Sequence, residues 1–212
     1  YSGYSGFSGI SGYSGVRGIA DWTPNLTNIT QSPTDSGTFT KTGGTNNTWD
    51  SQVYSTQGYV RGVYATAKIT STAHHVMFGL NSDPATDASY TSIDYAIYLN
   101  AGTVGIFESN TNPYNGGAYV VGDVFTVTYD GYNVRYYQNG TLLRTIARAI
   151  GAALYFDSTL YETNAVLTAV GFGPMGEQGT SGYSGTNGSN GTNGTSGYSG
   201  YSGFSGISGY SG

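Results

Sequence analysis

Glycine recurs at every third residue near both ends of this 212-residue chain, and this period limits the fold more than any other feature. One run covers residues 1–18 and the other covers residues 173–212, and neither slips out of frame. A period of three suits a triple helix, in which three polyproline-II-like chains bring every third residue to an axis with room only for hydrogen. Disordered or stacked-strand repeats are the alternative, but nothing forces them to keep frame.

We therefore predict collagen-like triple-helical segments at 1–18 and 173–212, on either side of a folded domain at 19–172. Because such a rod needs three chains, the expected partner is the chain itself, as a homotrimer. The chain begins and ends inside a repeat, so we expect it to be a segment of a longer protein. The predicted axis residues are Gly3, Gly6, Gly9, Gly12, Gly15, Gly18, Gly173, Gly176, Gly179, Gly182, Gly185, Gly188, Gly191, Gly194, Gly197, Gly200, Gly203, Gly206, Gly209 and Gly212.

The two runs are poor in proline, and Pro174 is the only one they contain. Collagen usually carries roughly 15–20% proline or hydroxyproline, which fixes φ and lowers the entropy lost on ordering. Most triplets instead have Tyr, Phe or Ile followed by Ser. We therefore expect the folded domain to nucleate and stabilise the rods.

Composition excludes several classes of function. The chain has no cysteine, which excludes disulfides, thiolate zinc sites and iron–sulfur clusters. The net charge is −5 with only seven Lys and Arg, so we expect no nucleic-acid partner. No apolar run approaches the ~20 residues of a membrane helix, so we expect no membrane insertion.

The middle of the chain is rich in strand and turn signals. Asp130-Gly131 and Asn139-Gly140 each separate two alternating segments, which is the strongest short-range sign of a β-hairpin. Only residues 145–153 have a sequence that could make a helical turn. With eight to eleven short strands, we predict an all-β fold, an antiparallel two-sheet jelly-roll sandwich. The expected strand segments are 58–70, 76–80, 93–99, 103–108, 123–129, 134–138, 141–145, 154–156 and 165–172.

The stretch GDVFTVTYDGYNVRYYQNGTLLR at 122–144 resembles the paired hairpins of concanavalin-like lectin, laminin-G and SPRY-type sandwiches. Phe156-Asp157 and the final Gly171-Phe-Gly-Pro174 are also similar to this group. The resemblance implies the fold more than a ligand, and it implies that the first and last strands pair antiparallel. The alternation of such a domain with Gly-Tyr-Ser triplets resembles the fibres of tailed bacteriophages and their relatives, which implies an extracellular or virion-surface location.

Two polar segments are candidate ligand-binding loops, at 81–92 and 109–117. Each places tyrosine among Asn, Asp and Gly, a combination that suits a cell-surface glycan. The candidate ligand-binding residues are Tyr90, Tyr114, Asn81, Asp83, Asp87 and Asn115. No cofactor is predicted, although Asp83, Asp87 and Asp94 leave a calcium site as an alternative, because hard cations prefer several oxygen ligands.

Few other residues suggest metal binding, sugar binding or catalysis. Adjacent residues on a strand point to opposite faces, so His74 and His75 are expected to lie one inward and one outward rather than share a metal. Trp22 and Trp49 are expected to pack in the core or a trimer interface more readily than to stack on sugars. We assign no catalytic residue. Carboxylates available for glycoside hydrolysis are Asp94, Glu108, Asp123, Asp130 and Asp157, of which Asp130 is best explained as a turn residue.

The sequence thus favours a structural fibre that carries a lectin-like module for surface attachment. The alternative is a purely structural fibre whose β domain is a trimerisation and registration spacer, and a polysaccharide-degrading enzyme is a third class. A binding module should expose clustered aromatic residues beside Asn or Asp, whereas a spacer should bury them between protomers. If the two ends of the domain are adjacent, each domain projects sideways from the rod.

Overall fold

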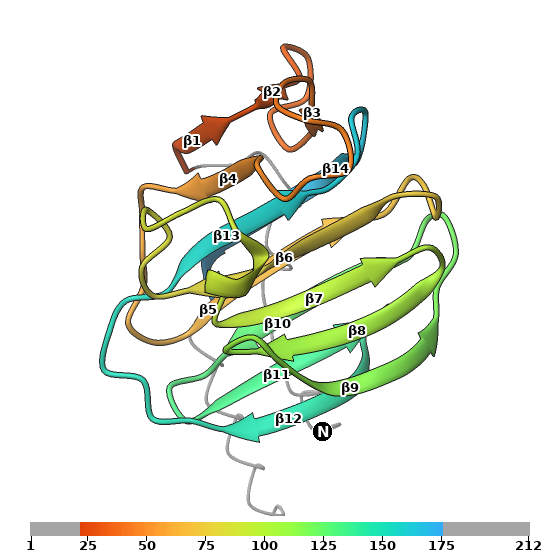
Figure 1. Cartoon of the computed structure of the whole chain (residues 1–212). Coiled ribbons are helices and arrows are strands. Elements are labelled where there is room, and N and C mark those ends of the chain that lie inside the picture. Colours follow the sequence, from red (N-terminus) through yellow and green to blue (C-terminus); the bar gives the residue numbers. More distant parts are fainter. Residues whose placement is uncertain (1–21, 176–212) are drawn as a thin grey trace, which may run out of the picture. The chain divides into compact units, whose positions relative to one another are not determined.

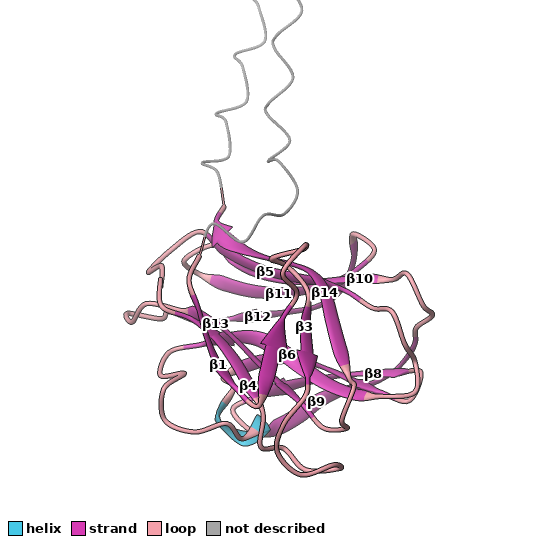
Figure 2. Ribbon diagram, turned by 90° about the horizontal axis from the view of Figure 1, so that it is seen from above, coloured by secondary structure: helices cyan, strands magenta, loops and turns pink. Residues whose placement is uncertain are grey.

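The computed structural model describes residues 22–175, which fold into two seven-stranded antiparallel sheets stacked face to face (Figures 1 and 2). Sheet A has the order β1-β4-β13-β6-β7-β8-β9, and sheet B has the order β12-β11-β10-β5-β14-β3-β2. The predicted two-sheet sandwich is confirmed. Fourteen strands are present in the described part of the chain, more than the eight to eleven predicted.

The strands are short, as the dense turn signals indicate. Sheet A contains β1 (Pro24–Thr27), β4 (Gln52–Ser55), β13 (Tyr155–Leu160), β6 (His75–Asn81), β7 (Tyr95–Asn100), β8 (Thr103–Glu108) and β9 (Thr111–Ala118). Sheet B contains β12 (Thr141–Ala147), β11 (Asn133–Gln138), β10 (Val124–Tyr129), β5 (Val63–Lys68), β14 (Val166–Pro174), β3 (Phe39–Lys41) and β2 (Ile29–Gln31).

The core lies between the sheets and is filled by alternate residues of each strand. Phe125, Val127 and Tyr129 of β10 are fully buried on one face, as their spacing predicts. Phe78 of β6 faces them from sheet A, and Trp22 is buried beside the same cluster. The prediction that Trp22 packs in the core is confirmed.

Both predicted hairpin turns are present in sheet B. Asn139 and Gly140 have φ of 50° and 79°, the left-handed pair that a tight hairpin turn between twisted strands requires. In the other turn, Asp130 Oδ1 accepts hydrogen bonds from the backbone N–H groups of Tyr132 and Asn133, at 2.8 and 2.7 Å. Asp130 is therefore a turn residue, as predicted.

One local prediction is wrong. Residues 109–117, expected as a loop, form most of β9, an edge strand whose register is interrupted by bulges that accommodate its Asn, Pro and Gly residues. Residues 145–153, the one segment judged able to make a helical turn, contain none: β12 continues to Ala147 and residues 148–153 are loop. Within the described chain the only helix is a single 3₁₀ turn, η1 (Tyr90–Ser92).

The domain extends beyond its predicted end at residue 172. Gly173, assigned to the triple-helix axis, lies in β14 and pairs with Tyr64 of β5. A Cβ on Gly173 would meet the Tyr64 ring at 3.8 Å, an ordinary contact, whereas one on Gly171 would stand 3.0 Å from Thr66 Cγ2. Gly173 therefore belongs to a strand of the sandwich in the described structure, although it also stands in the period-3 frame. The remaining predicted axis glycines, Gly3–Gly18 and Gly176–Gly212, lie outside the described residues.

The chain enters and leaves the domain close together. The predicted pairing of the first and last strands is wrong, because β1 pairs with β4 and β14 pairs with β5 and β3. Even so, the rings of Trp22 and Phe172 are 6.2 Å apart between centroids. The adjacent ends on which a sideways-projecting domain depends are therefore present.

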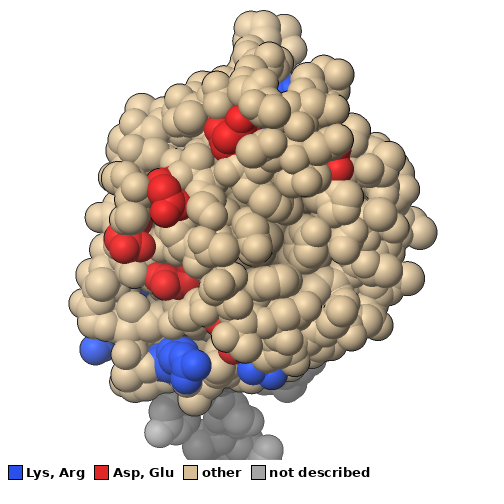
Figure 3. Space-filling model, in the orientation of Figure 1, with Lys and Arg blue, Asp and Glu red and all other residues tan. Residues whose placement is uncertain are grey.

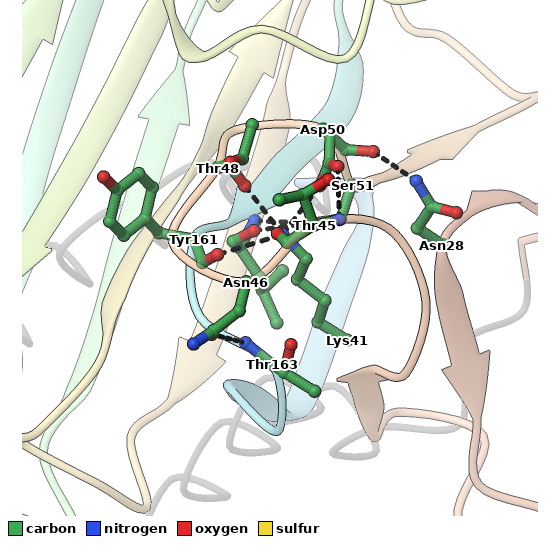
Figure 4. A network of polar contacts seen from close by, with 10 residues as sticks. Asn28, Lys41, Thr45, Asn46, Thr48, Asp50, Ser51, Tyr161 and Thr163 are labelled. Carbon is green, nitrogen blue, oxygen red and sulfur yellow. Dashed lines mark hydrogen bonds and ion pairs between the residues drawn. The ribbon is translucent and has the colours of Figure 1, made fainter.

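A buried lysine fixes the loop between β3 and β4 (Figure 4). The Lys41 side chain is inaccessible to solvent, and its Nζ donates to Asp50 Oδ1 at 2.7 Å. It also lies 2.9, 2.6 and 2.9 Å from the carbonyl oxygens of Thr45, Thr48 and Tyr161. Four oxygens thus surround one ammonium, which ties loop 42–51 to the chain after β13.

Candidate functional site

A surface hollow of about 530 Å³ lies over the outer face of sheet A. We call it the β4–β13 hollow. Two half-buried tyrosines, Tyr54 and Tyr155, line it, and each alternates along its strand with a core residue, Val53 or Phe156. Its full lining is Asn25, Tyr54, Ser55, Thr56, Ser82, Asp83, Pro84, Ala85, Thr86 and Tyr155.

Strand pairing brings the two tyrosines together. Tyr54 lies directly opposite Asp157 across the β4–β13 ladder, which makes Tyr155 its diagonal neighbour on the same face. The Tyr155 ring also needs the absence of a side chain at Gly58, where a Cβ would lie 2.6 Å from the ring. Two aromatic rings thus border a hollow whose other walls carry hydroxyl, amide and carboxyl groups.

The rim of the hollow is held in place by hydrogen bonds. Ser82 donates from its backbone N and its Oγ to Asp94 Oδ2, at 2.9 and 2.6 Å, which fixes the start of loop 82–94. The Gln52 side chain donates to the carbonyl oxygen of Pro84 at 2.7 Å. The loop is therefore pre-organised before any ligand arrives, which lowers the entropy cost of binding.

A buried carboxyl group supports this rim from below. Asp157 is 1% exposed, and its two oxygens accept hydrogen bonds from Gln52 Nε2 at 3.0 Å and Asn81 Nδ2 at 2.8 Å. Burial raises the pKa of Asp157 to about 7, against the opposing effect of the two amide donors. The group beneath the rim consequently changes charge near neutral pH.

Only one of the six predicted ligand-binding residues lines the hollow, and that is Asp83. Asn81 is fully buried and donates to Asp157, so it does not line the hollow. The reason is that loop 82–94 folds back over the outer face onto which Asn81 projects. Asp87 closes a turn, because its Oδ1 accepts from Ser89 N and Ser92 Oγ.

The other three predicted residues lie elsewhere on sheet A. Tyr90 packs against Trp49, with ring centroids 5.3 Å apart, in a small apolar cluster on the outer face. Tyr114 packs against the main core from β9, and Asn115 is exposed on the same strand. The structure therefore does not bring the two predicted loops into one site.

Sequence reasoning missed Tyr54, Tyr155 and Asn25. A signal existed for Tyr155, because it sits between Leu154 and Phe156 in a predicted strand and must face away from the core. No such signal showed that β4 and β13, a hundred residues apart, are neighbours.

The two histidines lie where β6 begins, and in that strand Val76 belongs to the main core and Met77 to the outer cluster. Both are partly buried, and His75 Nδ1 contacts the carboxylate of Glu162 while its ring packs 5.5 Å from that of Tyr161. Within residues 22–175, no three His, Asp or Glu side chains are grouped as a metal site would require.

The carboxylates considered for hydrolysis are engaged in internal contacts. Glu108 accepts two hydrogen bonds from the Arg144 guanidinium, at 2.9 and 3.1 Å. Asp123 accepts from Asn139 Nδ2 at 2.8 Å, and Asp130 pairs with Arg135 at 2.5 Å. The structure gives each of these groups a local role that needs no substrate.

No protein-family model and no curated protein sequence matches the chain. Among solved structures, the SPRY domain of human HERC1 matches with a TM-score of 0.51 at 14% identity, over 69% of this chain and 92% of that one. The TRIM65 PSpry domain matches with a TM-score of 0.50 at 14% identity, over 68% and 88%.

A third similar structure is the exoplasmic/lumenal domain of VIP36 in its Ca²⁺/Man-bound form. It matches with a TM-score of 0.51 at 9% identity, over 69% of this chain and 80% of that domain. In the part of the chain that the structure describes, no helix is long and apolar enough to cross a membrane. At these identities the likeness establishes the fold: residues 22–175 form a jelly-roll β-sandwich of the concanavalin and SPRY type.

Proposed function

We propose that this chain is a segment of a trimeric fibre whose β-sandwich attaches to a surface glycan through the β4–β13 hollow. The observation that carries the proposal is the pairing of Tyr54 and Tyr155 on one open face, beside Asn25, Thr56 and Asp83. Sugars present both apolar C–H faces and hydroxyl groups, so flat rings flanked by hydrogen-bonding side chains complement them.

The charge distribution supports an uncharged or weakly charged ligand. On the face of sheet A seen in Figure 3, acidic side chains are scattered mostly over the left half, most basic ones lie along the lower edge, and most of the surface carries no charge. Such a face has no basic patch for a phosphate-rich polymer. Among the proteins of similar fold, the VIP36 domain has been solved in a Ca²⁺/Man-bound form.

In this proposal the glycine repeats at the two ends of the chain form the rod of the fibre. Three copies of a glycan-binding domain on one rod would bind with high avidity even if each hollow binds weakly, because the second and third contacts become intramolecular. An extracellular or virion-surface location follows from this role.

The spacer alternative predicts aromatic side chains buried between protomers. The hollow instead leaves two tyrosines partly open beside an amide and a carboxylate, the arrangement expected of a binding module. The enzyme alternative gains no support from the internally engaged carboxylates Glu108, Asp123 and Asp130.

A glycan array probed with the full chain tests the proposal. We expect the wild type to bind a defined set of glycans and Tyr54→Ala/Tyr155→Ala to lose that binding while keeping its fold by circular dichroism. Tyr137→Ala, on the outer face of sheet B, is the matched control and should bind as the wild type does. Failure of the wild type to bind any glycan, or full binding by the double variant, would overturn the proposal.

A further inference from the structure

Two exposed apolar side chains lie where the chain leaves the sandwich. Val60 is 50% exposed and Tyr132 is 69% exposed. The Cγ and Cδ atoms of Arg61 lie 3.4 Å from the position that a Cβ on Gly131 would take. Val60 and Tyr132, the neighbours of these two residues, are therefore at the same end of the sandwich. Met175 joins them, because its backbone N donates to the carbonyl oxygen of Gly62 at 2.5 Å. We call Val60, Arg61, Tyr132 and Met175 the exit patch.

The chain also enters the domain near this patch. Tyr59, the neighbour of Val60, has its ring 5.5 Å from that of Phe172, and Trp22 lies on the same phenylalanine at 6.2 Å. Residues 1–21 precede Trp22 and residues 176–212 follow Met175, and both carry the glycine repeat. The first and last described residues, Trp22 and Met175, therefore lie at one end of the domain, where Val60 and Tyr132 are exposed.

We propose that the exit patch is a self-association surface at which three copies of the domain meet around the axis of the rod. The inference rests on the trimer of the proposed function and names the surface that the trimer would use. Gly176 is the first glycine of the run beyond the domain, so residues adjacent to Met175 are those that a three-chain rod would draw closest together. Burial of Val60 and Tyr132 would then stabilise the assembly in proportion to the apolar area removed from water.

Another pair of exposed apolar residues, Val120 and Val121, provides a control. They are 64% and 60% exposed and precede Gly122, whose N–H donates to Ile69 O just beyond the far end of β5. The exit patch adjoins Val63, the first residue of that strand. The six residues of β5 span about 20 Å, so the two exposed pairs stand at opposite ends of the sandwich.

Cysteine cross-linking in the full chain tests the surface, because the wild type contains no cysteine that could react. Tyr132→Cys and Val121→Cys are treated with a short bis-maleimide and analysed on a denaturing gel. We expect Tyr132→Cys to form covalent dimers efficiently, since one thiol per copy can join two of three copies. Val121→Cys should remain monomeric on the gel.

Sedimentation of the untreated chains separates the two proposals. A wild type that sediments as a monomer overturns both the trimeric fibre and this surface. A wild-type trimer in which Tyr132→Cys cross-links no better than Val121→Cys overturns the surface alone and leaves a trimer held by its rods. As a second readout, the trimer formed by Val60→Asp/Tyr132→Asp should dissociate at a higher protein concentration than the trimer formed by Val120→Asp/Val121→Asp. Equal dissociation of the two trimers would contradict the inference.

Discussion

Two loops are fastened to the sandwich by buried ionisable groups, and the groups are partnered differently. Loop 42–51 surrounds the ammonium of Lys41, which has a carboxylate partner in Asp50 and three carbonyl oxygens. Loop 82–94 rests above Asp157, whose only side-chain hydrogen-bond partners are the neutral amides of Gln52 and Asn81.

The difference decides how each loop responds to pH. Burial works to raise the pKa of Asp50, but hydrogen bonds from Lys41 and Thr45 outweigh it and hold that pKa below its usual value. For Asp157, burial outweighs its amide donors and raises the pKa to about 7. The Asp50 carboxylate, paired with an ammonium, therefore keeps its charge to a lower pH than usual. The Asp157 carboxyl, with neutral partners, changes charge near neutral pH, and it lies under the rim of the proposed glycan site.

The largest expected effect on stability comes from removing the buried ammonium group of Lys41. Lys41→Met should lower the free energy of unfolding by about 4 kcal/mol, because it leaves Asp50 and three carbonyls facing an apolar side chain. Urea denaturation measures this loss. Lys68→Met, at an exposed lysine on β5, is the control and should change stability by less than about 0.5 kcal/mol. A loss no larger than that of the control would show that the network contributes no stability.

The pH dependence of stability should be the next largest effect. The folded pKa of Asp157, about 7, lies above its ordinary value of 3.8, so the folded state binds more protons between these values. Stability from this group therefore rises as the pH falls from about 7 to about 4, by up to about 3 kcal/mol. Asp50, with its lowered pKa, withdraws stability only below about pH 4.

Urea titrations at pH 8, 6 and 4.5 measure this profile. Asp157→Asn removes the titrating group while keeping the side-chain shape, and it should flatten the profile above pH 4.5. A wild type whose stability is constant over this range would contradict the shifted pKa.

A third prediction tests whether the rim of the hollow contributes to glycan binding. Gln52→Leu removes the hydrogen bonds from Gln52 Nε2 to both Pro84 O and Asp157 Oδ1. It should cost about 2 kcal/mol of stability, because the buried carboxyl loses a donor, and it should weaken glycan binding by loosening loop 82–94. Gln31→Leu removes one hydrogen bond, to Ser36 O, in loop 32–38 and should leave binding unchanged. Equal binding by both variants would exclude the rim from the site.

The extent to which sequence predicts this molecule differs between the sheets. The sequence predicts most of sheet B, because Phe125, Val127 and Tyr129 alternate with polar residues and Asn139-Gly140 specifies a hairpin turn. Sheet A is less predictable: β9 contains Asn, Pro and Gly that normally indicate a loop, and β1 and β4 are four residues each without an alternating pattern. Local signals describe hairpins, whereas β1, β4 and β13 pair across long sequence distances.

The same limit applies to the site. The polar composition of residues 81–92 identified Asp83 and its loop, which is local information. Tyr54 and Tyr155 become partners only through the β4–β13 pairing, and the burial of Asn81 follows from the path of the loop that covers it. Composition can therefore nominate a loop, but it cannot state which strands meet beneath it.

The smallest expected effect separates the aromatic wall of the hollow from its rim. Gly58→Ala places a methyl group 2.6 Å from the Tyr155 ring, so the ring must rotate away from its position beside Tyr54. We expect a stability loss of roughly 1 kcal/mol, since Tyr155 is only half-buried and can move into solvent. Glycan binding should nevertheless fall as far as it does in Tyr155→Ala, because both variants remove the same ring from the hollow. Gly151→Ala, where an added Cβ meets no atom within 4 Å, is the matched control for the loss of a glycine and should bind like the wild type. If Gly58→Ala binds as the wild type does while Gln52→Leu does not, the ligand contacts the rim and not the tyrosines, and the site moves onto loop 82–94.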